Sequence, residues 1–222
     1  YRHEDSKALE VQWDNLPDYV DGDVNAVVMA DVSGSMYGRP LATSIGLAMY
    51  FAERNKGAYH NLFMTFSGNP KFVEVKGNTI TQKINFISRA EWGGNTDVEA
   101  ALLKILDVAL ENNCSQVEMP KSLVVIFDMD IDCCTNQKHR ENDYDYVSRV
   151  YEEHGYKIPN VVFWNVNSRH DVFLADKDRK GVQLVSGQSA STFKNLIGCV
   201  DKTPVEMMYS VLNSERYQAI QM

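Results

Sequence analysis

Short, nearly continuous apolar runs constrain the fold of this chain more than any other feature. They cover residues 24–30, 123–127 and 161–166, and they are rich in Val, Ile and Phe. Runs of this length and composition are typical of strands that are buried on both faces of a parallel sheet. None approaches the ~20 apolar residues that a membrane-spanning helix needs. The sequence therefore predicts buried parallel strands and no membrane span.

Helical patterns alternate with these runs. Between residues 40 and 52 the apolar side chains recur at the spacing of one helix face, and Pro40 suits the first turn. Further helices are expected at residues 81–89, 96–111, 143–154, 189–197 and 204–212, and further strands at 62–66 and 182–185. Residues 71–75 alternate between polar and apolar, which predicts an antiparallel edge strand. The predicted fold class is α/β: a doubly wound, mostly parallel central sheet with one antiparallel edge strand and helices on both faces.

Length, charge and cysteine usage limit the domain organisation and the partners. A chain of 222 residues that is 44% hydrophobic can bury one core, so residues 21–222 are predicted to form one domain. Residues 1–20 are interpreted as a lead-in from a missing upstream domain, because the chain begins with Tyr1. The net charge of -8 does not suit nucleic-acid binding, which needs a basic face. The four cysteines show no Cys-x-x-Cys spacing, which favours reduced thiols and a cytoplasmic protein.

Oxygen-bearing side chains follow the predicted strands at three loops. Asp31, Ser33 and Ser35 come directly after the first apolar run, Thr96 lies in a glycine-rich loop, and Asp128 follows the run at 123–127. Ligands bind at the carboxyl ends of the strands in an open parallel sheet, and alternate residues of an extended loop point to one side. Carboxylate and hydroxyl oxygens without His or Cys suit Mg²⁺ or Mn²⁺ and disfavour Zn²⁺. The sequence therefore predicts one metal site made by these five residues.

The five positions closely resemble the metal-ion-dependent adhesion site (MIDAS) of von Willebrand factor type A (vWA) domains, whose pattern is Asp-x-Ser-x-Ser, then Thr, then Asp. The resemblance covers roughly residues 20–215 and implies a Rossmann-like vWA fold. It also implies that Ser33, Ser35 and Thr96 touch the metal directly, while Asp31 and Asp128 act mainly through waters. A cation held by neutral hydroxyls keeps positive charge and seeks an outside anion. The expected function is binding to a protein partner with an acidic ligand residue, without catalysis.

Further segments look like an uncharacterised family of intracellular proteins that is similar in layout to the Ro ribonucleoproteins. They are residues 31–40, 92–97, 127–129, 159–165 and 181–187. Phe127 departs from the pattern, because many relatives carry a small polar residue before the Asp. The resemblance implies a C-terminal vWA domain behind a helical module. RNA is then a possible partner through that missing module.

Other interpretations compete with a metal site. Asp31, Ser33 or Ser35 could simply cap the helix that begins near Pro40. A strand that runs into Asp128-x-Asp130 also resembles the nucleophile loop of haloacid-dehalogenase-type phosphotransfer enzymes, although the later acidic pattern of that class is missing. Asp130 and Asp132 read as solvated loop acids. A metal that only orders three loops of an inert scaffold remains a third alternative.

Asp97, beside Thr96, could be a negative charge at a helix start, where it would complement the helix dipole, or an acid in the outer shell of the metal; the helix-start role is favoured.

Overall fold

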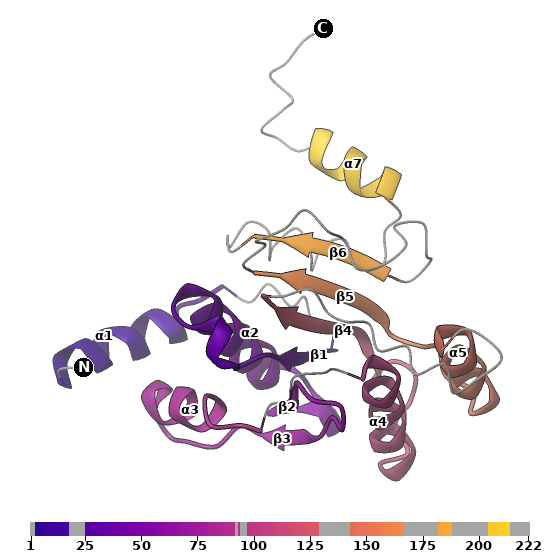
Figure 1. Ribbon diagram of the computed structural model, residues 1–222, viewed down its shortest axis with the longest axis horizontal. Coiled ribbons are helices and arrows are strands. Elements are labelled where there is room, and N and C mark those ends of the chain that lie inside the picture. The colour runs from indigo at the N-terminus through magenta and orange to yellow at the C-terminus, as the bar shows by residue number, and fades with distance from the viewer. Residues whose placement is uncertain are drawn as a thin grey trace, which may run out of the picture.

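Six strands form a single sheet in the order β3-β2-β1-β4-β5-β6 (Figure 1). The computed structural model describes residues 3–17, 25–91, 93, 97–128, 143–166, 182–187 and 204–213. The strands are β1 (Asn25–Ala30), β2 (Leu62–Thr65), β3 (Phe72–Glu74), β4 (Pro120–Phe127), β5 (Asn160–Asn165) and β6 (Val182–Ser186). All neighbours pair in parallel except β2 and β3, which are antiparallel. The predicted mostly parallel sheet with one antiparallel edge strand is confirmed.

Helices lie on both faces of this sheet. The described helices are α1 (His3–Asp14), α2 (Arg39–Arg54), α3 (Ile80–Ile87), α4 (Val98–Glu111), α5 (Asp143–Glu153) and α7 (Pro204–Leu212). One face carries α2 and α3, and the other carries α4 and α5 (Figure 1). The helix expected at 189–197 lies outside the described residues. None of the helices described has both the length and the hydropathy to cross a bilayer.

The core lies on the two faces of the central strands. Every residue of β1 is buried, as the apolar run predicts. Ala26, Val28 and Ala30 pack with α2, while Val27 and Met29 pack with α4 on the opposite face. This alternation follows from the pleat, which points successive side chains to opposite sides. The central strands are therefore fixed from both faces, and the loops at their ends start from rigid positions.

Helix α2 ends at Arg54. Asn55 leaves the helical conformation, and its side chain donates to the Ala26 carbonyl at 2.8 Å and accepts from the Ala26 N–H at 3.0 Å. The side-chain amide of Asn55 thus pairs with both backbone polar groups of Ala26, as the backbone of a neighbouring strand would. The contact holds the C-terminal end of α2 to the first residues of β1.

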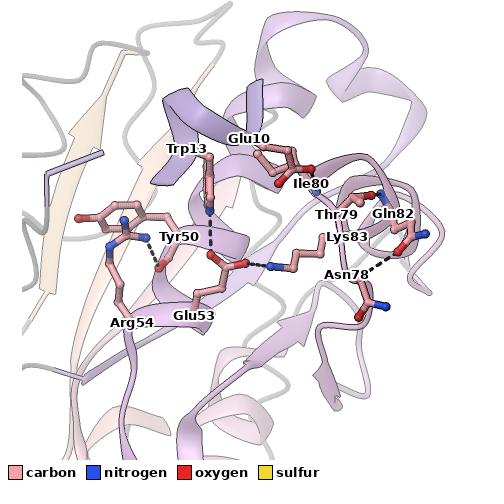
Figure 2. A network of polar contacts seen from close by, with 10 residues as sticks. All are labelled: Glu10, Trp13, Tyr50, Glu53, Arg54, Asn78, Thr79, Ile80, Gln82 and Lys83. Atoms are coloured by element: carbon pink, nitrogen blue, oxygen red, sulfur yellow. Dashed lines mark hydrogen bonds and ion pairs between the residues drawn. The ribbon is translucent and has the colours of Figure 1, made fainter. Parts of the chain in front are cut away.

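The N-terminal segment forms helix α1, which packs against α2 and α3 (Figure 2). The indole Nε1 of Trp13 donates to Glu53 Oε2 at 2.8 Å, and the N–H of Ile80 donates to Glu10 Oε1 at 2.6 Å. Glu53 also forms an ion pair with Lys83. Residues 3–14 therefore contact the domain directly, whereas their origin in an upstream domain stays a prediction.

Of the four cysteines, Cys114 lies in the described part of the chain, where it is buried and forms no disulfide. The other three lie outside the described residues.

Candidate metal site

The loop after β1 is fixed at both of its ends. The N–H of Asp31 donates to the carbonyl of Ile126 at 3.1 Å, which extends the pairing of β1 with β4 by one residue. Asp31 Oδ1 then accepts from the N–H of Ser33 at 2.7 Å and folds the loop back. A single 3₁₀ turn, Gly34–Met36, follows, and its Met36 is fully buried. The two serines therefore lie on a backbone that is held between the sheet and the core.

Four of the five predicted ligands form one hydrogen-bonded group. The hydroxyls of Ser33 and Ser35 lie 2.9 Å apart, and Ser35 Oγ donates to Asp128 Oδ1 at 3.0 Å. Asp31 joins the group through its bond to the Ser33 backbone. Two loops that are distant in sequence thus bring two carboxylates and two hydroxyls together. Their role as metal ligands stays a prediction.

Thr96, the fifth predicted ligand, lies outside the described residues, as do Asp130 and Asp132. The residues on either side of the Thr96 segment contact the loop after β2. The N–H of Gly93 donates to the Phe66 carbonyl at 2.9 Å, and the N–H of Asp97 donates to the Ser67 carbonyl at 3.4 Å. Strand β2 ends beside β1, so Gly93 and Asp97 lie at the same edge of the sheet as the Asp31 loop.

Asp97 itself has a helix-start role. Its Oδ1 accepts from the N–H of Ala100 at 2.8 Å and caps α4. The predicted negative charge at the start of this helix is therefore confirmed, and the carboxylate is occupied by a backbone donor.

Two buried carboxylates face each other across the site. Asp31 is 5% exposed and Asp128 is 2% exposed. Burial raises the pKa of Asp31 above its ordinary value, hydrogen bonds from Ser33 lower it, and the charge of Asp128 raises it. In the described part of the chain no Lys or Arg pairs with either carboxylate. The site therefore concentrates negative charge that these residues do not compensate.

One oxygen in the site has no hydrogen-bond partner. Asp128 Oδ2 is buried and is unpartnered among the described residues. Leaving a buried carboxylate oxygen unsatisfied is costly, so this atom fits a cation or a cation-bound water. No cluster of three His, Cys, Asp or Glu side chains occurs in the described ranges. The described side chains beside the two carboxylates are hydroxyls, and a set of carboxylate and hydroxyl oxygens suits Mg²⁺ or Mn²⁺ better than Zn²⁺.

The interpretation of the serine loop as a helix cap is wrong. The residue that precedes α2 is Gly38, and no side chain caps this helix. Gly38 has a φ of 93°, a left-handed conformation that favours glycine, and Pro40 lies in the first turn of the helix as predicted. Asp31 accepts from Ser33 two residues on, inside the loop. The side chains of the loop are thus directed to one another and to Asp128, not to the start of α2.

The strand order explains why these loops meet. The order β3-β2-β1-β4-β5-β6 reverses direction in sequence between β1 and β4, and Asp31 and Asp128 directly follow these two strands. A crevice outside the carboxyl ends of the strands at such a reversal is the usual ligand site of open α/β sheets. The sequence predicted the edge of the sheet but not the adjacency of these strands.

One exposed residue of this loop was not singled out from the sequence. Tyr37, at 87% exposed, directly follows the 3₁₀ turn. A tyrosine directly before a glycine, in a loop that is otherwise mostly polar, is the signal that could have identified it.

Comparison with known proteins places the chain among domains without an assigned role. Residues 25–218 match the family described as "Domain of unknown function (DUF7788)". The uncharacterized protein L728 of Acanthamoeba polyphaga mimivirus is 30% identical over 208 residues, which are 92% of this chain and 36% of that protein. The chain thus spans about a third of the length of this curated relative.

Two solved structures are similar in fold. The Ro (RSR) protein of Deinococcus radiodurans superposes with a TM-score of 0.57 at 15% identity, over 86% of this chain and 37% of that chain. The vWA domain of SpRpn10 has a TM-score of 0.42 at 10% identity, over 79% of this chain and 94% of that chain. The Ro protein therefore contains a region with the same overall fold as this chain.

Proposed function

The chain belongs to the DUF7788 family, and from the geometry of its site we propose that it is a metal-dependent binding module. Its ligands are Asp31, Ser33, Ser35, Thr96 and Asp128, and its ion is Mg²⁺ or Mn²⁺. The observation that carries the proposal is the buried, unpartnered Asp128 Oδ2 beside a second buried carboxylate and two hydroxyls.

The burial of the ligands differs across the site. Asp31 and Asp128 are buried, whereas Ser33 is half-buried and Ser35 is exposed. The carboxylates would therefore hold the inner side of the site, through waters as the vWA resemblance implies, and the hydroxyls would hold the side that solvent reaches. A bound dication supplies positive charge that accepts an outside oxygen. A partner would approach over the serines and place a carboxylate on the ion.

Binding fits these residues better than catalysis. Within the described residues, the side chains of Ser33 and Ser35 bond to each other and to Asp128, and no histidine contacts them. A serine nucleophile is usually activated by an adjacent histidine, and these contacts hold the hydroxyls against each other and a carboxylate instead, which supports binding over nucleophilic catalysis. The proposal of a phosphotransfer enzyme through Asp128 and Asp130 has no support from a described residue beyond Asp128.

The module is proposed to act inside a larger, Ro-like protein, as its C-terminal domain. Its span of 36% of the mimivirus relative and 37% of the Ro chain supports this arrangement. RNA binding through an upstream module is the alternative. The net charge of -8 argues for a protein partner at the domain itself.

Titration calorimetry of the full 222-residue chain with Mg²⁺ and Mn²⁺ tests the metal site. We expect binding by the wild type and at least ~10-fold weaker binding by Ser35→Ala and Asp128→Asn, because each change removes an oxygen ligand or its charge. The matched control is Asp107→Asn on α4, whose carboxylate is exposed and paired with Lys104. Equal heats for wild type and both site variants, in protein that melts normally, would refute the site.

A further inference from the structure

Tyr37 is the most exposed of the large hydrophobic residues in the described part of the chain. Its side chain is 87% accessible, and it lies two residues after Ser35. Single exposed apolar residues are common on protein surfaces, so exposure alone carries no function. The position of Tyr37 makes its exposure relevant, because it belongs to the loop that carries the hydroxyls of Ser33 and Ser35 and directly follows its 3₁₀ turn.

The backbone presents Tyr37 rigidly. The N–H of Tyr37 donates to the Gly34 carbonyl at 3.3 Å, and the N–H of Met36 donates to the Ser33 carbonyl at 3.1 Å. Met36 is fully buried in the core that α2 covers, which fixes the residue before Tyr37. An aromatic ring on a fixed backbone loses little conformational entropy on binding, which is why Tyr dominates many binding surfaces.

The surface around the ring is open. A Cβ atom added at Gly34 or at Gly38 would meet nothing within 4 Å. Open space thus lies at the glycines before and after Tyr37, and the exposed ring is accessible to a partner chain. Arg39, two residues after Tyr37, is also exposed and carries a positive charge. This charge and a bound dication together favour a partner segment with an acidic side chain. They disfavour a basic residue beside that acidic side chain in the partner.

We propose that Tyr37 selects the partner: a protein segment that places an acidic side chain on the ion and an apolar side chain from a neighbouring position against the Tyr37 ring. This inference rests on the proposed metal-dependent function and adds the sequence class of the ligand. A nucleic-acid base could also stack on an exposed ring. The acidic charge of the chain favours the peptide.

A displayed library of twelve-residue peptides with one fixed central Asp tests the proposal. The full chain is immobilised in Mg²⁺, and bound clones are eluted with EDTA. We expect wild type to enrich apolar residues next to the fixed Asp. Tyr37→Ala should still yield EDTA-eluted clones but lose this enrichment, and it should bind the wild-type clones about 10-fold more weakly. Tyr37→Phe keeps the ring and should behave as wild type.

Matched controls separate the outcomes. Tyr209→Ala removes another exposed tyrosine, on α7, and should leave the selection unchanged. The same apolar preference with wild type and Tyr37→Ala would overturn the role of Tyr37 while leaving the metal-dependent function intact. An absence of EDTA-eluted clones with wild type would overturn both. Binding of a uridine oligonucleotide that needs both Mg²⁺ and Tyr37, without peptide enrichment, would overturn the peptide in favour of RNA.

Discussion

Asp31 is a buried carboxylate whose neighbours shift its pKa in opposite directions. Burial raises the pKa, the two bonds from Ser33 lower it, and Asp128 raises it, with a net upward shift. The raised pKa means that the folded, metal-free protein holds a proton on Asp31 more firmly than the unfolded chain does. Stability from this group is therefore complete below the ordinary pKa of 3.8 and is lost as the pH rises through the folded pKa.

Asp31→Asn tests this charge at the level of one residue. In EDTA above the folded pKa, the variant should be more stable than wild type and its free energy of unfolding should change less with pH, because it has no buried charge to desolvate. Saturating Mg²⁺ should reverse the order, because only the wild-type carboxylate is compensated by the ion. Urea unfolding at pH 4 and pH 7.5, with and without Mg²⁺, measures both effects. A variant that is less stable in EDTA at pH 7.5 would contradict the charge argument.

At the scale of secondary-structure elements, α1 shows how polar contacts dock a helix onto the domain. Glu53 on α2 accepts from Trp13 on α1 and from Lys83 on α3, so one carboxylate joins three helices (Figure 2). The rings of Trp13 and Tyr50 meet edge to face at 6.4 Å, and the hydroxyl of Tyr50 donates to the Pro17 carbonyl at 3.0 Å. The docking therefore depends on a few directional contacts.

Glu53→Gln should loosen α1 without unfolding the sheet. The substitution removes the charge that strengthens the bond from Trp13 on α1 and pairs with Lys83 on α3; the carboxylate is only partly buried, so a loss of about 1 kcal/mol is expected. Hydrogen exchange should accelerate in α1 while the amides of β1 and β4 stay protected. Lys104→Gln is the control, because it breaks an exposed ion pair on α4 and should leave α1 unchanged. Uniform acceleration across the sheet would show that Glu53 stabilises the whole domain.

The sequence predicted most elements, and the differences have physical causes. Continuous apolar runs located β1 and β5 closely, because both strands are buried on two faces. Strand β4 begins at Pro120, before the apolar run at 123–127, since its polar first residues still pair with neighbouring strands. Helix α1 lies in the segment that was expected only as a lead-in, because a helix docked by polar contacts has little apolar periodicity to detect.

The residues of the candidate site were also predicted in part from the sequence. Asp31, Ser33, Ser35 and Asp128 were predicted from loop chemistry at strand ends, and the structure brings them together. The order of the strands could not be read from the pattern, because apolar runs of similar composition do not reveal which strands are neighbours. The exposure of Tyr37 depends on the burial of Met36, which is a property of the fold.

At the scale of the whole molecule, the site joins the two central strands, so an ion bound there should stabilise the entire domain. A ligand that binds only the folded state adds about 2.7 kcal/mol at 100 times its Kd. We therefore expect Mg²⁺ to raise the melting temperature of wild type and EDTA to lower it. Ser35→Ala should shift less at the same Mg²⁺ concentration, because its binding is expected to be at least ~10-fold weaker. A melting temperature independent of Mg²⁺ in wild type would contradict metal binding to the folded state.

The pairing of β1 with β4 also has a consequence for how the protein folds. The Ser35–Asp128 bond closes a separation of 93 residues, and β1 must already lie between β2 and β4 for Asp31 and Asp128 to face each other. Contacts between residues so far apart in sequence form late in folding, because the entropy lost on closing a long loop opposes them. The serine turn alone can form early, but it offers no carboxylate from β4. A nascent or misfolded chain would therefore not bring Ser35 and Asp128 together. Binding of the proposed ion would then distinguish the completely folded domain from partly folded forms.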